Sequence, residues 1–223
     1  MLAKKGNGLL MVYSDVAAEN DEEYNRWYNE EHIPERLSIP GVLNAARYEA
    51  VQGGPRYLAC YELESAETWS SDSWQKWLNE PTEWSKRMSP SVIGTAYIRN
   101  LYTRIYPDDL SEETAQSEMA PVLLVGRMSV PEEIDIKFNK AYNEERLPEA
   151  MKIPGYIRAR RWKAVMGLQP NCKQPGQHLD THCTGGLRFL FYRLQHRVGP
   201  VEDRPGRSGA DCPRGQFFEL PGN

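Results

Sequence analysis

Two stretches of the chain, 114 residues apart, share one pattern and constrain the fold more than any other feature of the sequence. EYNRWYNEEHIPERLSIPG spans residues 23–41, and KFNKAYNEERLPEAMKIPG spans residues 137–155. Between residues 24–51 and 138–165, 14 of 28 aligned positions are identical without a gap. This similarity predicts an internal duplication. Two copies are too few for a solenoid, so we expect a closed pseudo-dimer.

The first copy alternates apolar and helical patterns in the order β-α-β-β-α-β. We expect strands at residues 9–15, 42–51, 56–63 and 93–106, and helical segments at 21–33 and 66–87. Pro34 disfavours helical geometry in the residue before it, so the first helix is expected to end near Ile33. This order is typical of the split βαβ, or ferredoxin-like, unit.

The second copy follows the same order only in part. Its predicted strands are 121–130, 156–165 and 187–194, and the first copy's pattern is lost after Val165. The abrupt change indicates divergence, an irregular tail or a shifted reading frame in the source gene. We therefore divide the chain into a first ferredoxin-like repeat at 1–106, an acidic linker at 107–120, a divergent second repeat at 121–194 and a Gly/Pro/Arg-rich, irregular tail at 195–223.

These elements predict an α+β fold in which two tandem ferredoxin-like repeats form a dimeric-type α+β barrel, with the second repeat incomplete. Packing two sheets face to face buries the face that helices leave bare, and the space between the sheets is the expected cavity. Missing elements of the second repeat would leave a sheet edge, which favours a homodimer that covers it.

Charge and hydropathy narrow the class of partner. The net charge is −4 with both signs mixed, so no basic patch indicates nucleic acid or a lipid surface. No apolar stretch approaches the roughly 20 residues of a membrane helix, and the run at 9–13 is too short for a signal peptide. We expect a cytoplasmic protein that binds a small neutral or anionic molecule.

The four cysteines do not predict disulfides or a metal site. They are scattered along the chain, without the dense framework of a small disulfide-stabilised domain. Cys172, His178, His182 and Cys183 have the chemistry of zinc ligands, but two histidines four residues apart share a face only on a helix. Pro175 lies in this stretch and disfavours a helix, so we predict no metal.

The helix that carries Tyr28-Asn-Glu-Glu-His32, followed by Ile-Pro and then by Ile39-Pro40-Gly41 before a strand, resembles the EthD-like group of dimeric α+β-barrel proteins. The resemblance covers residues 7–106 and 120–166. It implies a barrel with a small-molecule cavity and no fixed cofactor, and chemistry that isomerises, cyclises, dehydrates or decarboxylates lactone-like and polyketide-like compounds. Related barrels include cofactor-free monooxygenases and haem-binding proteins. The family histidine corresponds to His32 here and to Arg146 in the second copy.

Tyr24, Tyr28 and His32 stand four residues apart and form one stripe on a helix. An imidazole titrates near neutral pH, and a phenol can orient or polarise a carbonyl, so His32 and Tyr28 are the catalytic candidates. At a helix C-terminus the dipole favours the protonated ring, which makes acid or oxyanion-stabilising work as suitable as base work. The structural alternatives are a capping role for His32 and aromatic packing for the tyrosines.

Further candidates for substrate binding come from aromatic and basic side chains near this stripe. They are Tyr24, Trp27, Tyr13, Tyr48 and Tyr61, with Arg36 for a carboxylate and Arg146 as an anion-binding counterpart of His32. Trp69, Trp74, Trp77 and Trp84 are expected in the helix-to-sheet core or on an association surface. The sequence thus predicts a cofactor-independent enzyme of lyase or isomerase type, or a non-catalytic binding barrel, or a monooxygenase or haem-binding barrel.

Overall fold

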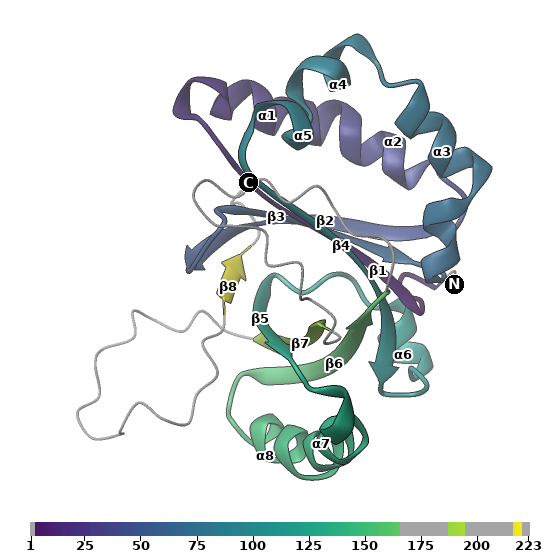
Figure 1. The fold of residues 1–223 in the computed structure, drawn as a ribbon, viewed down its shortest axis with the longest axis vertical. Coiled ribbons are helices and arrows are strands. Elements are labelled where there is room, and N and C mark those ends of the chain that lie inside the picture. The colour runs from purple at the N-terminus through teal and green to yellow at the C-terminus, as the bar shows by residue number, and fades with distance from the viewer. Residues whose placement is uncertain (1–2, 166–186, 195–215, 220–223) are drawn as a thin grey trace.

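The structure is a computed structural model that describes residues 3–165, 187–194 and 216–219. Within these residues eight antiparallel strands form a closed barrel in the order β1-β3-β2-β8-β5-β7-β6-β4 (Figure 1). The strands are β1 (Gly8–Val16), β2 (Val42–Gln52), β3 (Tyr57–Leu63), β4 (Gly94–Tyr106), β5 (Val122–Ser129), β6 (Tyr156–Ala164), β7 (Leu187–Leu194) and β8 (Gln216–Glu219).

The helices lie on the outside of the barrel, and none in the described ranges is long and apolar enough to cross a membrane. The first repeat has η1 (Ala18–Asn20), α1 (Asp21–Trp27), η2 (Tyr28–His32), α2 (Ile33–Leu37), η3 (Ala66–Ser70), α3 (Asp72–Asn79), α4 (Glu83–Met88) and α5 (Pro90–Ile93). The linker contains α6 (Glu112–Gln116). The second repeat has η4 (Glu132–Ile134), α7 (Asp135–Ala141), η5 (Tyr142–Arg146) and α8 (Leu147–Met151).

Each repeat supplies one four-stranded sheet with the same strand order. The first sheet is β2-β3-β1-β4 and the second is β6-β7-β5-β8, and the two join at β2 with β8 and at β4 with β6. Helices α1–α5 cover the outer face of the first sheet, and α7 and α8 cover that of the second (Figure 1). The predicted α+β barrel of two ferredoxin-like repeats is confirmed.

The expectation that the tail from residue 195 is irregular is wrong for β8. Glu219 pairs with Glu49 of β2, and Phe218 pairs with Leu123 of β5, so every strand position of the second sheet is filled. The open edge from which a homodimer was argued is therefore absent from the described strands. Four residues in a Gly/Pro-rich segment carry too little pattern to predict, because their strand conformation depends on the neighbouring strands. The possible zinc ligands and the segment 195–215, which corresponds in order to α3–α5, lie outside the described residues.

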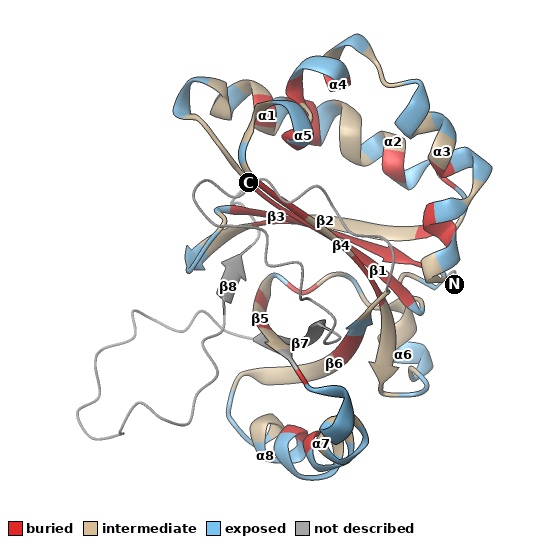
Figure 2. Ribbon diagram, viewed as in Figure 1, coloured by how far each residue is buried: buried red, intermediate tan, exposed pale blue. Residues whose placement is uncertain are grey.

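Among the described residues, side chains of both repeats pack inside the barrel, and a small cavity is found where a substrate cavity between the two sheets was expected. Alternation along β1 sends Leu9, Met11 and Tyr13 inward, where they belong to one buried cluster with Val125 and Trp162 of the second repeat. Buried segments lie along β1, β5 and β6, strands of both repeats (Figure 2). An eight-stranded barrel is only just wide enough for its own side chains, and here large aromatic groups occupy that space.

The first helix does not end near Ile33, as predicted, but continues to Leu37. Its middle, η2, is a π-helical turn in which the Ile33 N–H donates to the carbonyl of Tyr28, five residues back. The wider turn accommodates Pro34, whose ring would clash with the carbonyl four residues back in an α-helix. The second repeat repeats this geometry in η5, directly before α8.

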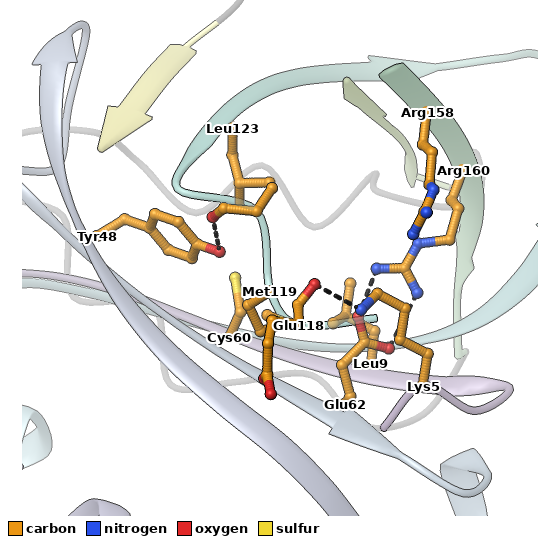
Figure 3. A pocket seen from close by; sticks show the side chains of 11 residues that line it. Lys5, Leu9, Tyr48, Cys60, Glu62, Glu118, Met119, Leu123, Arg158 and Arg160 are labelled. Carbon is orange, nitrogen blue, oxygen red and sulfur yellow. Dashed lines mark hydrogen bonds and ion pairs between the residues drawn. The ribbon is translucent and has the colours of Figure 1, made fainter. Parts of the chain in front are cut away.

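A buried ion pair joins the two repeats inside the barrel (Figure 3). Glu62 of β3 is 0% exposed, and Arg160 of β6 donates to both of its carboxylate oxygens, with Nη1 to Oε2 at 3.0 Å. Beside the pair, Lys5 Nζ donates to the Glu118 carbonyl at 2.8 Å, which ties the N-terminal segment to the linker. The remaining cavity of about 40 Å³ has room for water but not for a substrate.

Replacing Arg160 with Met should destabilise the fold by about 3–5 kcal/mol, because Glu62 would remain buried without a counter-charge. Lys152→Met, which breaks an exposed pair with Glu149, should cost about 1 kcal/mol or less. Urea denaturation of both variants measures the difference. Equal losses in the two variants would show that the pair does not hold the repeats together.

Candidate functional site

A cavity of about 360 Å³ lies between the outer face of the first sheet and the helices that cover it. Its volume is in the range of small-molecule sites, about 300–1,000 Å³. Side chains from β3, β4, η2, α2 and the segment 66–93 line it, including Tyr28, His32, Arg36, Tyr61, Trp69, Trp74, Tyr97 and Arg99. The cavity is thus outside the barrel and under the helices, not between the sheets.

The π-helical turn decides what surrounds His32. The imidazole lies 4.5 Å from the Trp27 ring, centroid to centroid, and 5.0 Å from the Tyr28 ring. Trp27 is five residues before His32, a spacing that a π turn brings together and an α-helix does not. The predicted stripe at intervals of four therefore missed the closest aromatic neighbour of the histidine.

The structure brings part of the predicted site together. Trp27, Tyr28, Arg36 and Tyr61 line the same cavity as His32. Tyr24 is fully buried behind them and does not line the cavity, and its hydroxyl forms a 2.6 Å hydrogen bond with Ser14 Oγ. Its position fits the packing role better than substrate binding.

The other three predicted residues lie elsewhere. Tyr13 and Tyr48 are inside the barrel, on the far side of the sheet, and the Tyr48 hydroxyl donates to the Ala120 carbonyl at 2.8 Å. Arg146 lies on the exposed helix of the second repeat. Alternation along β1 explains why Tyr13 is separated from the site. Leu10 pairs with Tyr61 and lies on the same face of the sheet, whereas Tyr13 lies on the opposite face.

Three residues that line this cavity each carry a buried polar atom with no hydrogen-bond partner among the described residues. These atoms are His32 Nδ1, Arg36 Nη1 and Trp74 Nε1. Most buried polar groups in folded proteins are hydrogen-bonded, because an unpaired group loses its hydration without compensation. Three such groups around one cavity make it the candidate site for a polar ligand.

Burial lowers the pKa of His32 well below its ordinary value, and the positive charges of Arg36 and Arg47 lower it further. The ring is therefore neutral at pH 7 and can accept a proton. The predicted dipole effect does not apply, because the helix continues past His32 to Leu37. Burial also raises the pKa of Tyr28 and of Tyr61, so both phenols stay protonated and available as donors.

The charge that faces the cavity is positive. Arg36 is 7% exposed and stacks over Trp74 at 5.3 Å, while Arg99 of β4 stacks over Trp69 at 4.5 Å. No Asp or Glu belongs to the lining.

The sequence pattern did not predict Arg99 or Tyr97. Alternation along residues 93–106 places the two on one face of the strand, but it does not say which face meets the helices. Their side chains could be assigned to the site only once the barrel showed which face of β4 the helices cover.

No family model matches the sequence, and no curated protein matches it. Solved structures with similar folds include an anthrone oxidase-like protein, with a TM-score of 0.59 and 12% identity over 99% of this chain and 94% of the other. Another is a chlorite dismutase-like protein, with a TM-score of 0.53 and 9% identity over 97% and 96% of the two chains. The chain has the dimeric α+β-barrel fold. At these identities the likeness shows the fold alone.

In this barrel, Glu31 holds the helical cover over the cavity. One carboxylate oxygen, Oε1, accepts from Thr82 Oγ1 at 2.6 Å and from Ser85 Oγ and Trp27 Nε1 at 3.1 Å each. The sequence pattern did not predict a role for Glu31. Its contacts give it a positioning role, because they join η2 to the start of α4 and hold the indole that packs on His32.

The free energy of unfolding should fall as the pH drops below about 6.5, the ordinary pKa of histidine. The lowered pKa in the folded state means that the unfolded chain binds the proton first. Stability from His32 is therefore complete above pH 6.5 and is lost toward its folded pKa, by at most about 1.4 kcal/mol per pH unit. Urea unfolding of the wild type and of His32→Asn at several pH values isolates this contribution. Parallel curves for the two proteins would contradict the lowered pKa.

Proposed function

We propose that the His32 cavity is an active site for cofactor-independent acid–base chemistry on an aromatic, lactone or polyketide-like compound, of the lyase, isomerase or cyclase type. The observation that carries this proposal is the set of unpaired buried polar atoms around His32. The resemblance of the YNEEH helix to the EthD-like group supports the same assignment for the histidine.

His32 acts as the general base in this mechanism. Its neutral imidazole, which lines the cavity, removes a proton from a carbon or hydroxyl of the bound compound. This proton transfer leaves a positive charge on the imidazole ring and a negative charge on the substrate oxygen. Returning the proton to another atom of the substrate completes an isomerisation and restores the neutral ring.

The surrounding side chains stabilise the charge that develops on the substrate. Tyr28 and Tyr61 both line the cavity as protonated phenols, which can donate to an enolate or alkoxide oxygen. Arg36 adds a positive charge on the same cavity. The tryptophan and tyrosine side chains that line the cavity lower the local dielectric constant, which strengthens these interactions.

The second repeat lacks this constellation at the matching positions. Arg146 replaces His32, Ala141 replaces Trp27 and Ala150 replaces Arg36. The duplication has therefore kept the helix geometry in both halves, and the proposed chemistry belongs to the first half alone.

Replacing His32 with Asn should lower turnover by about 10²- to 10⁴-fold, the usual contribution of a general base, with the fold retained. Product analysis after incubation with a panel of aromatic acids, lactones and quinones identifies the substrate and measures the loss. Glu30→Gln is the matched control, because Glu30 lies on the same helix but is exposed and pairs with Arg26. Tyr28→Phe should slow turnover less than His32→Asn does. Unchanged turnover in His32→Asn would refute the assignment of the base.

A non-catalytic binding barrel is the second candidate, favoured by the largely aromatic lining and the single histidine in the described part of the chain. Binding without conversion by the wild type, and retained binding by His32→Asn, would support it. A monooxygenase or haem-binding barrel remains the further alternative. Oxygen consumption or a haem absorbance band in the purified protein would identify it.

A further inference from the structure

We infer that the His32 cavity binds a planar aromatic carboxylate, whose negative charge pairs with Arg36 and Arg99. The inference rests on the proposed function in one respect, that this cavity is the ligand site. It concerns binding and not turnover, so it holds or fails independently of the role of His32 as a base.

Arg36 is the buried guanidinium that the fold does not satisfy. It is 7% exposed, and its Nη1 has no partner among the described residues. Arg47 is equally buried at 8%, but it donates to Asn25 Oδ1 at 2.8 Å and to Asn29 Oδ1 at 3.3 Å. A buried charge without partners is costly. Arg47 thus has amide acceptors on its neighbouring helix, whereas Arg36, which lines the cavity, has a nitrogen without an acceptor.

The charges around Arg36 favour an anion in the cavity. Burial lowers the pKa of Arg36, and the nearby positive charge of Arg99 acts in the same direction. Glu35 and the phenols of Tyr61 and Tyr28 act against this, but no carboxylate lines the cavity. Lys86 at the rim pairs with Glu83, so Arg36 and Arg99 carry the charge that a ligand would balance.

The aromatic side chains that line the cavity favour a ligand whose carboxylate is attached to a flat aromatic ring. Arg36 lies over Trp74 and Arg99 over Trp69, and the two indoles are 5.0 Å apart, centroid to centroid. Stacking on an indole face leaves the edge of a guanidinium open, and that edge matches a carboxylate in a bidentate pair. Trp27 and Tyr28 complete an aromatic enclosure around His32.

The second repeat shows that the fold does not need Arg36. Ala150 occupies the matching position, one turn after the same π-helical geometry in η5. Arg36→Ala therefore places in the first repeat the residue that the second repeat already has at this position. A loss of binding in this variant is then a loss of the guanidinium and not of the helix.

The test compares 2-naphthoate with its neutral isostere 2-naphthamide, by quenching of tryptophan fluorescence at pH 7.5. The wild type should bind the carboxylate at least about tenfold more tightly than the amide, as expected for a charged hydrogen-bonded pair. Arg36→Ala should reduce this ratio to about twofold or less while the affinity for the amide stays nearly unchanged. Arg26→Ala, which removes an exposed arginine, should keep the full ratio.

Arg36→Met preserves the apolar stem and provides the same comparison if the alanine variant does not fold. Arg99→Ala should lower the ratio in part. A wild-type ratio near one, an unchanged ratio in both Arg36 variants, or no binding of either compound at about 1 mM would overturn the inference. If Arg36→Ala loses the preference for the carboxylate over the amide while His32→Asn retains turnover, the inference about Arg36 is upheld and the assignment of His32 as the base is refuted.

Discussion

A buried arginine in each repeat fixes the helix to the sheet, and the rest of the site depends on this contact. Arg47 donates to the side-chain oxygens of Asn25 and Asn29, and Arg161 donates in the same way to Asn139 and Asn143, at 2.8 and 2.6 Å. Both guanidiniums also lie over tyrosine rings of the helix. Neutral amide oxygens and an aromatic face stabilise the guanidinium charge, so no buried carboxylate is needed. These contacts fix the rotation of the helix about its own axis relative to the sheet.

The rotation of the helix and its π turn together determine the chemistry available to His32. The turn brings the imidazole against Trp27, and burial there keeps the ring neutral. Arg47 contributes a positive charge that acts in the same direction. One contact therefore serves the fold in both repeats and the electrostatics of the site in the first.

The closed barrel separates the functions of its two surfaces. The interior is occupied by side chains of both repeats and by the Glu62–Arg160 pair, so it holds the halves together. The outer face of the first sheet is covered by helices with space left beneath them, and His32 and Arg36, each with an unpaired buried nitrogen, line that space. The contacts that stabilise the duplicated barrel and the proposed ligand site thus lie on opposite faces of the same strands.

The sequence by itself determined the duplication, the order of the strands and helices in the first repeat, and the placement of Tyr28 and His32 on one helix. These features follow from local periodicity and from the similarity between the copies. Only the tertiary structure decided that β8 completes the second sheet, that the cavity is under the helices, and that Arg99 joins it while Tyr13 does not. Periodicity shows which residues share a face, but the direction of that face depends on which strands close the barrel.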